Sequence, residues 1–293
     1  MSDTECHAGR AIYMDGRALA SSMLDDIAGN VSILASRIGK PPGLAIVQIG
    51  QESASASYVR AITRTCARVG IVARTLTLPS TASPEEFGDT LDALADDLGT
   101  SGIIVQLPVP VHLRDVLPGH MPPLKDVDGI HPLNAGLLAL GDPSALVPAT
   151  PLGGMALLRH YGVELDGCRA VVVGRSPVVG RPMALLLLQA NATVTVCHTR
   201  TQSLAELTRS AEVLVVATGR PKMITADMVS PGATVIDFGV NYVDGQMTGD
   251  VDTEAVARVA ARITPVPGGT GPMTNVMLVQ NTLRSAQRIQ ERN

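Results

Sequence analysis

The sequence is poor in aromatic residues: among 293 residues it has no Trp, two Phe and four Tyr. The core must therefore be aliphatic, and a surface that stacks on sugars or nucleobases is disfavoured. No run of about 18 apolar residues is present, as a membrane span would need. The first ten residues also lack the basic and then apolar order of a signal peptide. These absences predict a cytoplasmic protein without membrane contact.

Cysteine is also scarce, and its spacing excludes two kinds of site. The four cysteines lie far apart and form no CxxC pair, so neither a zinc knuckle nor a disulfide framework is expected. We predict buried thiols and no metal. The residues in question are Cys6, Cys66, Cys168 and Cys197. The formal net charge of −4 lacks the basic excess that nucleic-acid binding requires, so nucleic acid is not an expected partner.

What is present is an alternation of apolar β-rich runs with amphipathic helical stretches, which indicates an α/β fold with parallel sheets. With 45% hydrophobic content, the chain can build one large core or two modest ones. Residues 43–50, 71–78 and 102–106 read as strands of a first unit. Between the last two, Ser83, Pro84 and Glu86 form the capping pattern of a helix start.

A second βαβ series begins at Arg169, after a plausible boundary near Thr150. Its strands read as continuous hydrophobic runs, which is typical of a doubly wound, Rossmann-like sheet buried on both faces. We expect strands at residues 169–174, 192–198, 212–218 and 234–239. A helix capped by Ser203, with Glu206 three residues later, should lie among them. The chain ends in an amphipathic stretch over residues 272–290.

The turn after the strand at residues 169–174 reads GRSPVVG, and a helix follows. Glycines at such a turn let the backbone approach a pyrophosphate, and the N–H groups of the helix start point at it. The spacing is longer than GxGxxG, so a purely structural turn is the alternative. The candidate cofactor-binding residues here are Gly174, Arg175, Ser176, Val179 and Gly180.

The end of the next strand bears on which dinucleotide is bound. NAD-preferring folds place a carboxylate there against the ribose, whereas this chain has Thr199 and Arg200. Arg175 and Arg200 could instead pair a 2′-phosphate, which favours NADP over NAD. Alternatively, Arg200 is a solvated residue at a helix start. Val240, after the last strand, should lie beside the nicotinamide.

Six stretches in order resemble the methylenetetrahydrofolate dehydrogenase/cyclohydrolase family. They are SYVRAITRTCARVGI, GIIVQLPVP, PPLKDVDGIHPLNAG, GRSPVVGRPMALLL, NATVTVCHTRT and TPVPGGTGPMTNVMLVQNT. The resemblance implies a folate-binding catalytic domain formed by residues 1–149 and 272–293, and an NAD(P) domain over residues 150–271. It also implies a cleft between the two domains, a tetrahydrofolate one-carbon derivative as substrate, and a homodimer.

Carried over position by position, the resemblance implies that Tyr58 flanks the folate ring and that Gln106 reaches the one-carbon group. It implies that Asp128 holds the pterin, as a carboxylate paired with an aminopyrimidinone edge can. The remaining implied substrate-binding residues are Val105, Leu107, Pro267, Gly268 and Gly269. The alternatives are a turn-forming role for Asp128, a buried structural role for Gln106 and a core role for Tyr58.

One departure from the family pattern bears on the hydrolytic half-reaction. Four residues after Tyr58 the family has a catalytic Lys, and this chain has Ile62. Residues four apart share a helical face, so Ile62 should point into the cleft beside Tyr58. An alkyl group exchanges no proton, and Arg60 and Arg64 should face elsewhere. Lys125 is the remaining amine near the inferred pterin site.

The sequence therefore predicts oxidation of methylenetetrahydrofolate by hydride transfer to NADP, with cyclohydrolase activity weak or absent. Three alternatives stay open at this point. The chain could be a fully bifunctional enzyme that uses another general base. It could be a catalytically silent folate- or nucleotide-binding homologue, or a dehydrogenase of another small molecule on the same scaffold.

Overall fold

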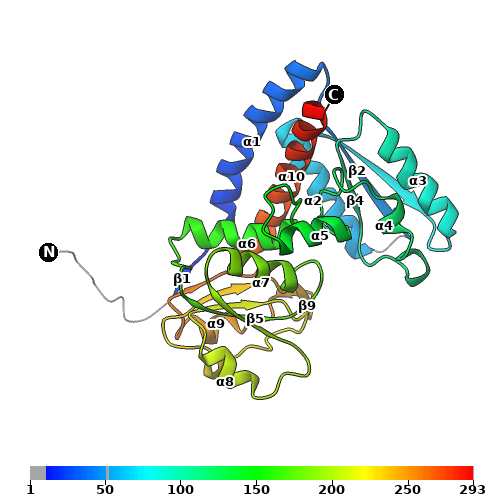
Figure 1. The fold of residues 1–293 in the computed structure, drawn as a ribbon. Helices are drawn as coiled ribbons and strands as arrows, with labels where there is room; N and C mark the ends of the chain where they lie inside the picture. The colour runs from blue at the N-terminus through cyan, green and yellow to red at the C-terminus, as the bar shows by residue number, and fades with distance from the viewer. Residues whose placement is uncertain (1–10, 51–52, 293) are drawn as a thin grey trace. The chain divides into compact units, whose positions relative to one another are not determined.

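The computed structural model describes residues 11–50 and 53–292 and divides into two compact units. The three-strand unit comprises residues 20–152 and 274–293, and the six-strand unit comprises residues 1–19 and 153–273. The chain passes between them within three helices: α1 (Gly16–Ile38), α6 (Ala149–His160) and α10 (Thr270–Arg292). Figure 1 shows these helices along the chain.

The three-strand unit contains a parallel sheet in the order β3-β2-β4. Its strands are β2 (Gly43–Ile49), β3 (Val72–Leu78) and β4 (Gly102–Val105), and they confirm the three predicted runs within a residue or two. Helix α2 (Ser53–Val69) connects β2 to β3. Helix α3 (Pro84–Asp96) starts as predicted, because the Ser83 hydroxyl accepts a hydrogen bond from the Glu86 N–H at 3.1 Å.

The core of this unit is aliphatic apart from Phe87, as the composition requires. Phe87, Leu91 and Leu94 on α3 pack against strands β2 and β4, at 3% exposure or less. After β4 the chain forms three short segments before it reaches α6. They are a 3-10 turn (Val111–Leu113), α4 (Leu117–His120) and α5 (Pro132–Ala139).

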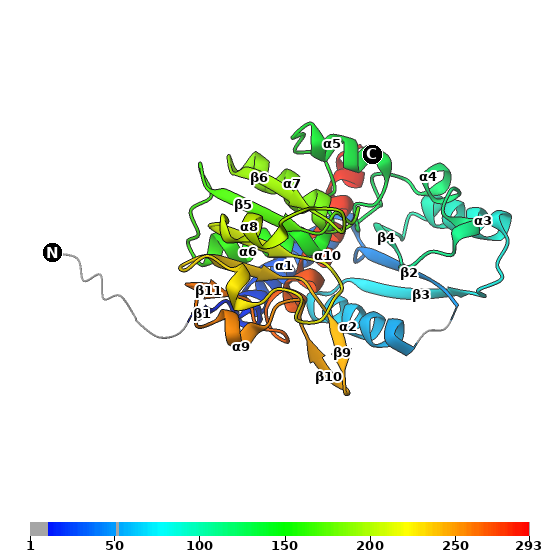
Figure 2. The ribbon, with the colours of Figure 1, turned by 90° about the horizontal axis from the view of Figure 1, so that it is seen from below.

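The six-strand unit contains a parallel sheet in the order β1-β11-β8-β7-β5-β6, of which Figure 2 labels β1, β11, β5 and β6. Its strands are β1 (Ile12–Tyr13), β5 (Arg169–Val173), β6 (Thr193–Cys197), β7 (Val213–Val216), β8 (Thr234–Asp237) and β11 (Arg262–Ile263). Its remaining elements are α7 (Gly180–Gln189), α8 (Leu204–Arg209), a 3-10 turn (Ala226–Met228), the hairpin of β9 (Asn241–Val243) with β10 (Gln246–Thr248), and α9 (Thr253–Val256).

The strand order reverses at β5, since β6 lies on one side of it and β7 on the other. Loops that leave β5 and β7 therefore diverge at the carboxyl edge, where such sheets bind ligands.

Three expectations need correction. Ser203 does not cap α8 with its side chain, because it takes the left-handed conformation (φ 50°) and only its carbonyl accepts the Glu206 N–H. Strand β6 is not buried on both faces, since it is the edge strand and Val196 is 40% exposed. The described residues 11–19 cluster with the six-strand unit, because β1 pairs with β11.

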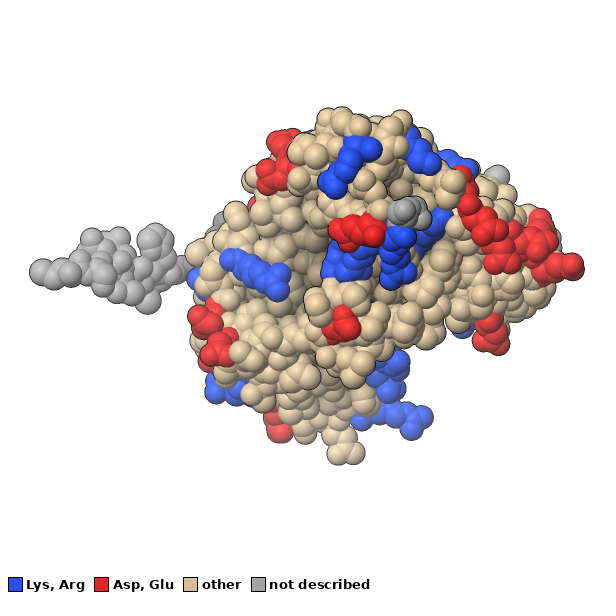
Figure 3. All heavy atoms as spheres, turned by 45° about the horizontal axis from the view of Figure 1, so that its top comes forward, with Lys and Arg blue, Asp and Glu red and all other residues tan. Residues whose placement is uncertain are grey.

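Two further expectations concern cysteines and membranes. Cys66, Cys168 and Cys197 are free and buried, as predicted, and Cys6 lies outside the described residues. None of the described helices is long and apolar enough to span a membrane. On the face drawn in Figure 3, basic and acidic side chains both occur, and near the centre they lie against one another.

Candidate active site

The loop that follows β4 in the three-strand unit is held by a buried carboxylate, Asp126. Its oxygens accept hydrogen bonds from the backbone N–H groups of Ile130 (3.2 Å) and His131 (2.9 Å) and from the Asn134 amide (2.8 Å). Gly129 (φ 65°) completes the turn, where a Cβ would lie 2.6 Å from the Leu146 carbonyl oxygen. Asp126 thus supplies the turn-forming role that was the alternative for Asp128.

Asp128 is left with a different environment. Within the described residues no hydrogen bond to its carboxyl group is found, although this side chain is only partly exposed. Burial raises the pKa of Asp128 to about 7, and the charge of Asp126 adds to the shift. Burial and then the charge of Asp128 raise the pKa of the Tyr58 phenol above its ordinary value. Asp128 and Tyr58 are therefore close enough to interact, and the Tyr58 hydroxyl stays a proton donor.

Gln106 follows β4 directly and is tied to β2 through its backbone N–H, which donates to the Val47 carbonyl oxygen at 2.8 Å. Its side-chain nitrogen makes a long contact of 3.4 Å to the Leu107 carbonyl oxygen. Its Oε1 atom is buried and has no partner among the described residues. A buried acceptor without a donor costs free energy, which a ligand N–H or a bound water would recover. Val105 is buried, and Leu107 is 38% exposed.

Helix α2 presents Tyr58 and Ile62 one turn apart. Ile62 has no exposed surface, and Cys66 and Val69 further along the same face are exposed by 2% or less. Tyr58 is half-buried, and Arg60 and Arg64 are exposed on the other side of the helix, as predicted. At position 62, where the resemblance implies a catalytic Lys, this chain therefore has a packed alkyl group that cannot exchange a proton.

Lys125 has a structural task. Its side-chain amine donates to three backbone carbonyl oxygens at the end of α3, those of Leu94, Ala95 and Asp97, at 3.2, 2.6 and 3.0 Å. These are the carbonyls that a helix leaves without intrahelical partners. Burial lowers the pKa of Lys125. All three N–H groups of the ammonium are engaged, so this amine is not directed toward Asp128.

In the six-strand unit, the glycine turn joins β5 to α7. Gly174 takes φ 131°, and a Cβ there would lie 2.2 Å from the Ala217 carbonyl oxygen. A Cβ on Gly180 would meet the Gly174 carbonyl oxygen at the same distance. The Ser176 hydroxyl accepts from the N–H groups of Val179 (3.1 Å) and Gly180 (3.4 Å) at the start of the helix. The turn is thus closed tightly, with no room for larger residues.

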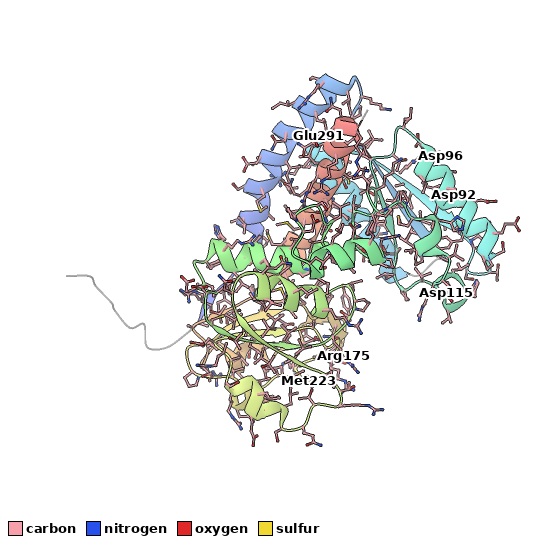
Figure 4. All side chains as sticks on the ribbon, in the orientation of Figure 1. Asp92, Asp96, Asp115, Arg175, Met223 and Glu291 are labelled. Atoms are coloured by element: carbon pink, nitrogen blue, oxygen red, sulfur yellow. The ribbon has the colours of Figure 1, made fainter. Side chains whose placement is uncertain are left out.

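A cavity of about 460 Å³ opens beside this turn, at the point where the strand order reverses. Arg175 and Thr199 line it as the sequence suggested, and so does Arg220, which sequence reasoning missed. Among the described residues that line it, Arg200 does not occur; its backbone N–H donates to the His198 ring at 3.2 Å. Figure 4 labels two of the lining residues, Arg175 from the loop after β5 and Met223 from the loop after β7.

A second cavity of about 350 Å³ in the same unit unites two groups of residues that the sequence assigned separately. Val240, expected at the nicotinamide, lines it together with Pro267, Gly268 and Gly269, expected at the folate. Arg17 also lines it, which the sequence did not indicate, and its guanidinium pairs with Asp15 at 2.6 Å. Within the described residues, no group of three or more His, Cys, Asp or Glu side chains is arranged to hold a metal ion.

Comparison with known proteins gives matches over nearly the whole chain. The catalytic domain of tetrahydrofolate dehydrogenase/cyclohydrolase matches residues 14–128, and its NAD(P)-binding domain matches residues 148–290. The "Bifunctional protein FolD" of Chloroflexus aggregans is 51% identical over 279 residues, which cover 94% of this chain and 98% of that protein.

Two solved structures extend the comparison. The Campylobacter jejuni FolD methylenetetrahydrofolate dehydrogenase/cyclohydrolase has a TM-score of 0.92 at 40% identity, covering 95% of this chain and 99% of that one. The Trypanosoma brucei dehydrogenase-cyclohydrolase, complexed with NADP and an inhibitor, has a TM-score of 0.91 at 35% identity, covering 96% and 99%. The two-unit α/β fold is that of these enzymes.

Proposed function

The chain belongs to the tetrahydrofolate dehydrogenase/cyclohydrolase family, and on this premise we propose that it oxidises 5,10-methylenetetrahydrofolate to the methenyl form with NADP. The proposal depends on one observation: the neighbouring carboxyl groups of Asp126 and Asp128 have different hydrogen-bond environments. Asp126 takes the backbone hydrogen bonds of the loop, which leaves the Asp128 carboxyl group for a ligand. A carboxylate placed in this way accepts two parallel N–H bonds from an aminopyrimidinone edge.

The other residues of the three-strand unit fit the same substrate. The buried Oε1 of Gln106 needs a donor, and the Gln106 amide would bind and orient the folate near its reacting nitrogens. Tyr58 keeps its proton and would flank the ring system beside Asp128. When bound, NADP supplies the hydride acceptor. The positive charge that develops on the folate is shared by its own two nitrogens, so the step needs orientation more than a general base.

NADP is the proposed cofactor because of the charges around the larger cavity. Arg175 and Arg220 both line it, and guanidinium groups bind phosphate by paired hydrogen bonds. The tight turn at Gly174 and Gly180 suits the close approach of a pyrophosphate. These residues fit a phosphorylated dinucleotide. NAD remains the competing cofactor, and the ratio of kcat/KM values decides between them.

We further propose that methenyl-folate hydrolysis is weak. Ile62 is fully buried and carries no titratable group. The Lys125 amine is hydrogen-bonded to backbone carbonyl oxygens at the end of α3. A positioned general acid or base contributes roughly 10²- to 10⁴-fold, so a hydrolysis that depends on this amine should fall on that scale.

A homodimer is proposed from the family resemblance and from one feature of the three-strand unit. Strand β3 forms an edge of its sheet over seven residues, and Val72 on it is 56% exposed. Open edges of this kind pair readily with another chain. Light scattering coupled to size exclusion should give a mass near twice that of one chain.

Two absorbance changes followed at once test the proposed reaction. With methylenetetrahydrofolate and NADP, nicotinamide reduction should proceed while methenyl-folate accumulates. Hydrolysis as fast as oxidation would instead indicate a fully bifunctional enzyme with another base. Folate binding without any nicotinamide reduction would identify a silent binding protein. Oxidation of another small molecule but not of the folate would contradict the proposed substrate.

A further inference from the structure

A buried carboxylate in the six-strand unit has no place in the reaction described so far. Asp250 follows the β9–β10 hairpin and has no exposed surface. One of its oxygens accepts hydrogen bonds from the backbone N–H groups of Thr218 (2.5 Å) and Gly219 (2.8 Å). The other accepts from the Asn241 side-chain amide at 2.9 Å. Hydrogen bonds from neutral donors to a carboxylate are stronger than those between two neutral groups, so these three bonds hold both loops firmly.

The donors belong to two different loops at the carboxyl edge of the sheet. Thr218 lies in the loop after β7, and this loop also contributes Ala217 and Arg220 to the larger cavity. Asn241 follows Val240, which lines the smaller cavity. Asp250 therefore bonds directly to one residue that lines the larger cavity and to the neighbour of one that lines the smaller.

A glycine makes room for this arrangement. A Cβ on Gly239 would lie 2.3 Å from the Asp250 carboxylate, so the carboxylate occupies the space that a side chain there would need. The backbone N–H of Asp250 donates to the Asp237 carboxyl group at 3.1 Å, which also accepts from Gly239 at 2.7 Å. Hydrogen bonds therefore hold both the backbone and the side chain of Asp250 in place.

We propose that Asp250 is a positioning residue for the nicotinamide dinucleotide, holding the walls of both cavities in the form that binds it. The inference rests on the proposed function, because it takes the two cavities as parts of one cofactor site. Binding groups that are held in place before the ligand arrives lose less entropy on binding. Loss of the carboxylate should therefore weaken cofactor binding without affecting the folate residues of the other unit.

Two substitutions, made in the full-length chain, should give graded effects. Asp250→Ala removes the carboxylate that accepts from three donors and should raise the dissociation constant of NADPH by about tenfold or more, equal to about 1.4 kcal/mol. Asp250→Asn keeps one oxygen for Thr218 and Gly219 and should have a smaller effect. Titration of NADPH fluorescence measures both. The KM for the folate, at saturating cofactor, should change less than the dissociation constant of NADPH, because Asp128, Gln106 and Tyr58 lie in the other unit.

Thr208→Val serves as a matched control, because this buried hydroxyl lies on α8 in the same unit and lines neither cavity. It should lower the melting temperature and leave NADPH binding unchanged. If Asp250→Asn and Asp250→Ala lower only the melting temperature, Asp250 is merely structural and the inference is wrong. If Asp250→Ala does not fold, Asp250→Asn alone decides between these results. A wild-type protein that binds neither NADPH nor NADH would instead overturn the proposed function itself.

Discussion

The side-chain amine of Lys125 donates to the carbonyl oxygen of Ala95 at 2.6 Å, although Lys125 is only three residues from Asp128 in sequence. Two more hydrogen bonds, to the carbonyl oxygens of Leu94 and Asp97, give each N–H group of the amine an acceptor. A cation at this end of α3 also lies favourably in the helix dipole. The geometry thus separates the two neighbours: Asp128 remains available to a ligand, whereas Lys125 stabilises the fold.

Lys125→Met should therefore lower stability but not chemistry. The methionine keeps the apolar stem and removes the three hydrogen bonds, which should cost about 1–3 kcal/mol of unfolding free energy. Urea unfolding measures this change. The kcat and KM for methylenetetrahydrofolate oxidation, and any residual hydrolysis, should stay within about twofold of wild type. Loss of a residual hydrolytic activity in a variant that still folds would make Lys125 the missing base.

Ile62→Lys should raise the hydrolysis of methenyl-folate. The new amine would lie one turn from Tyr58, and its burial should lower its pKa toward the range where proton exchange is efficient. We expect hydrolysis to increase by about tenfold or more, approaching the 10²-fold that acid–base groups contribute. The decay of methenyl-folate absorbance measures the rate.

Ile62→Met is the matched control, because it also replaces a compact side chain by a long flexible one but brings no titratable group. It should leave hydrolysis at the wild-type rate. Both variants will lose some stability, since Ile62 is fully buried, so each rate is compared at equal folded fraction. A well-folded Ile62→Lys enzyme that hydrolyses no faster would exclude Ile62 as the limiting residue.

The sequence predicted the elements of the fold well wherever a local pattern decided them. Ser83 capped its helix as expected, because its partner Glu86 lies within the same turn. Ser203 carried the same pattern and failed, since its backbone takes a left-handed conformation. Strand β1 had too few residues to show a period, and its place beside β11 depends on a pairing about 250 positions away.

The candidate site shows a similar limit. The resemblance implied that Asp128 of DVDG holds the pterin, and the hydrogen bonds show that Asp126, in the same motif, holds the loop. Arg220 was missed because nothing near it in sequence resembles a phosphate site. Its position at the cavity follows from β7 lying next to β5, which brings Arg220 to the same cavity as Arg175. Asp250 had no motif at all, since its three donors come from two separate loops.

Arg220→Gln should reduce the preference for NADP. A guanidinium that pairs with the 2′-phosphate contributes only with NADP, so its loss should lower the NADP-to-NAD ratio of kcat/KM by about tenfold. Arg200→Gln is the control, because Arg200 has the same charge but does not line the described cavity. Its ratio should stay within about twofold. The reverse result, with Arg200 decisive and Arg220 neutral, would restore the assignment made from the sequence.

Burial raises the pKa of Asp128 to about 7, so folate binding through this carboxyl group should depend on pH near neutrality. In the proposed complex the ionised carboxylate would accept two N–H bonds from the pterin, so kcat/KM for the folate should rise with pH through about 7 and then level off. The native state of the free protein holds this proton more tightly than the unfolded chain does. The contribution of Asp128 to stability should therefore fall as pH rises from about 4 to 7. Binding of folate and stability of the free protein thus have opposite pH trends.

The dissociation constant of NADPH, measured over the same pH range, controls for general effects of pH on the fold. A folate profile that is flat between pH 6 and 8 would mean that Asp128 is already ionised or does not touch the substrate.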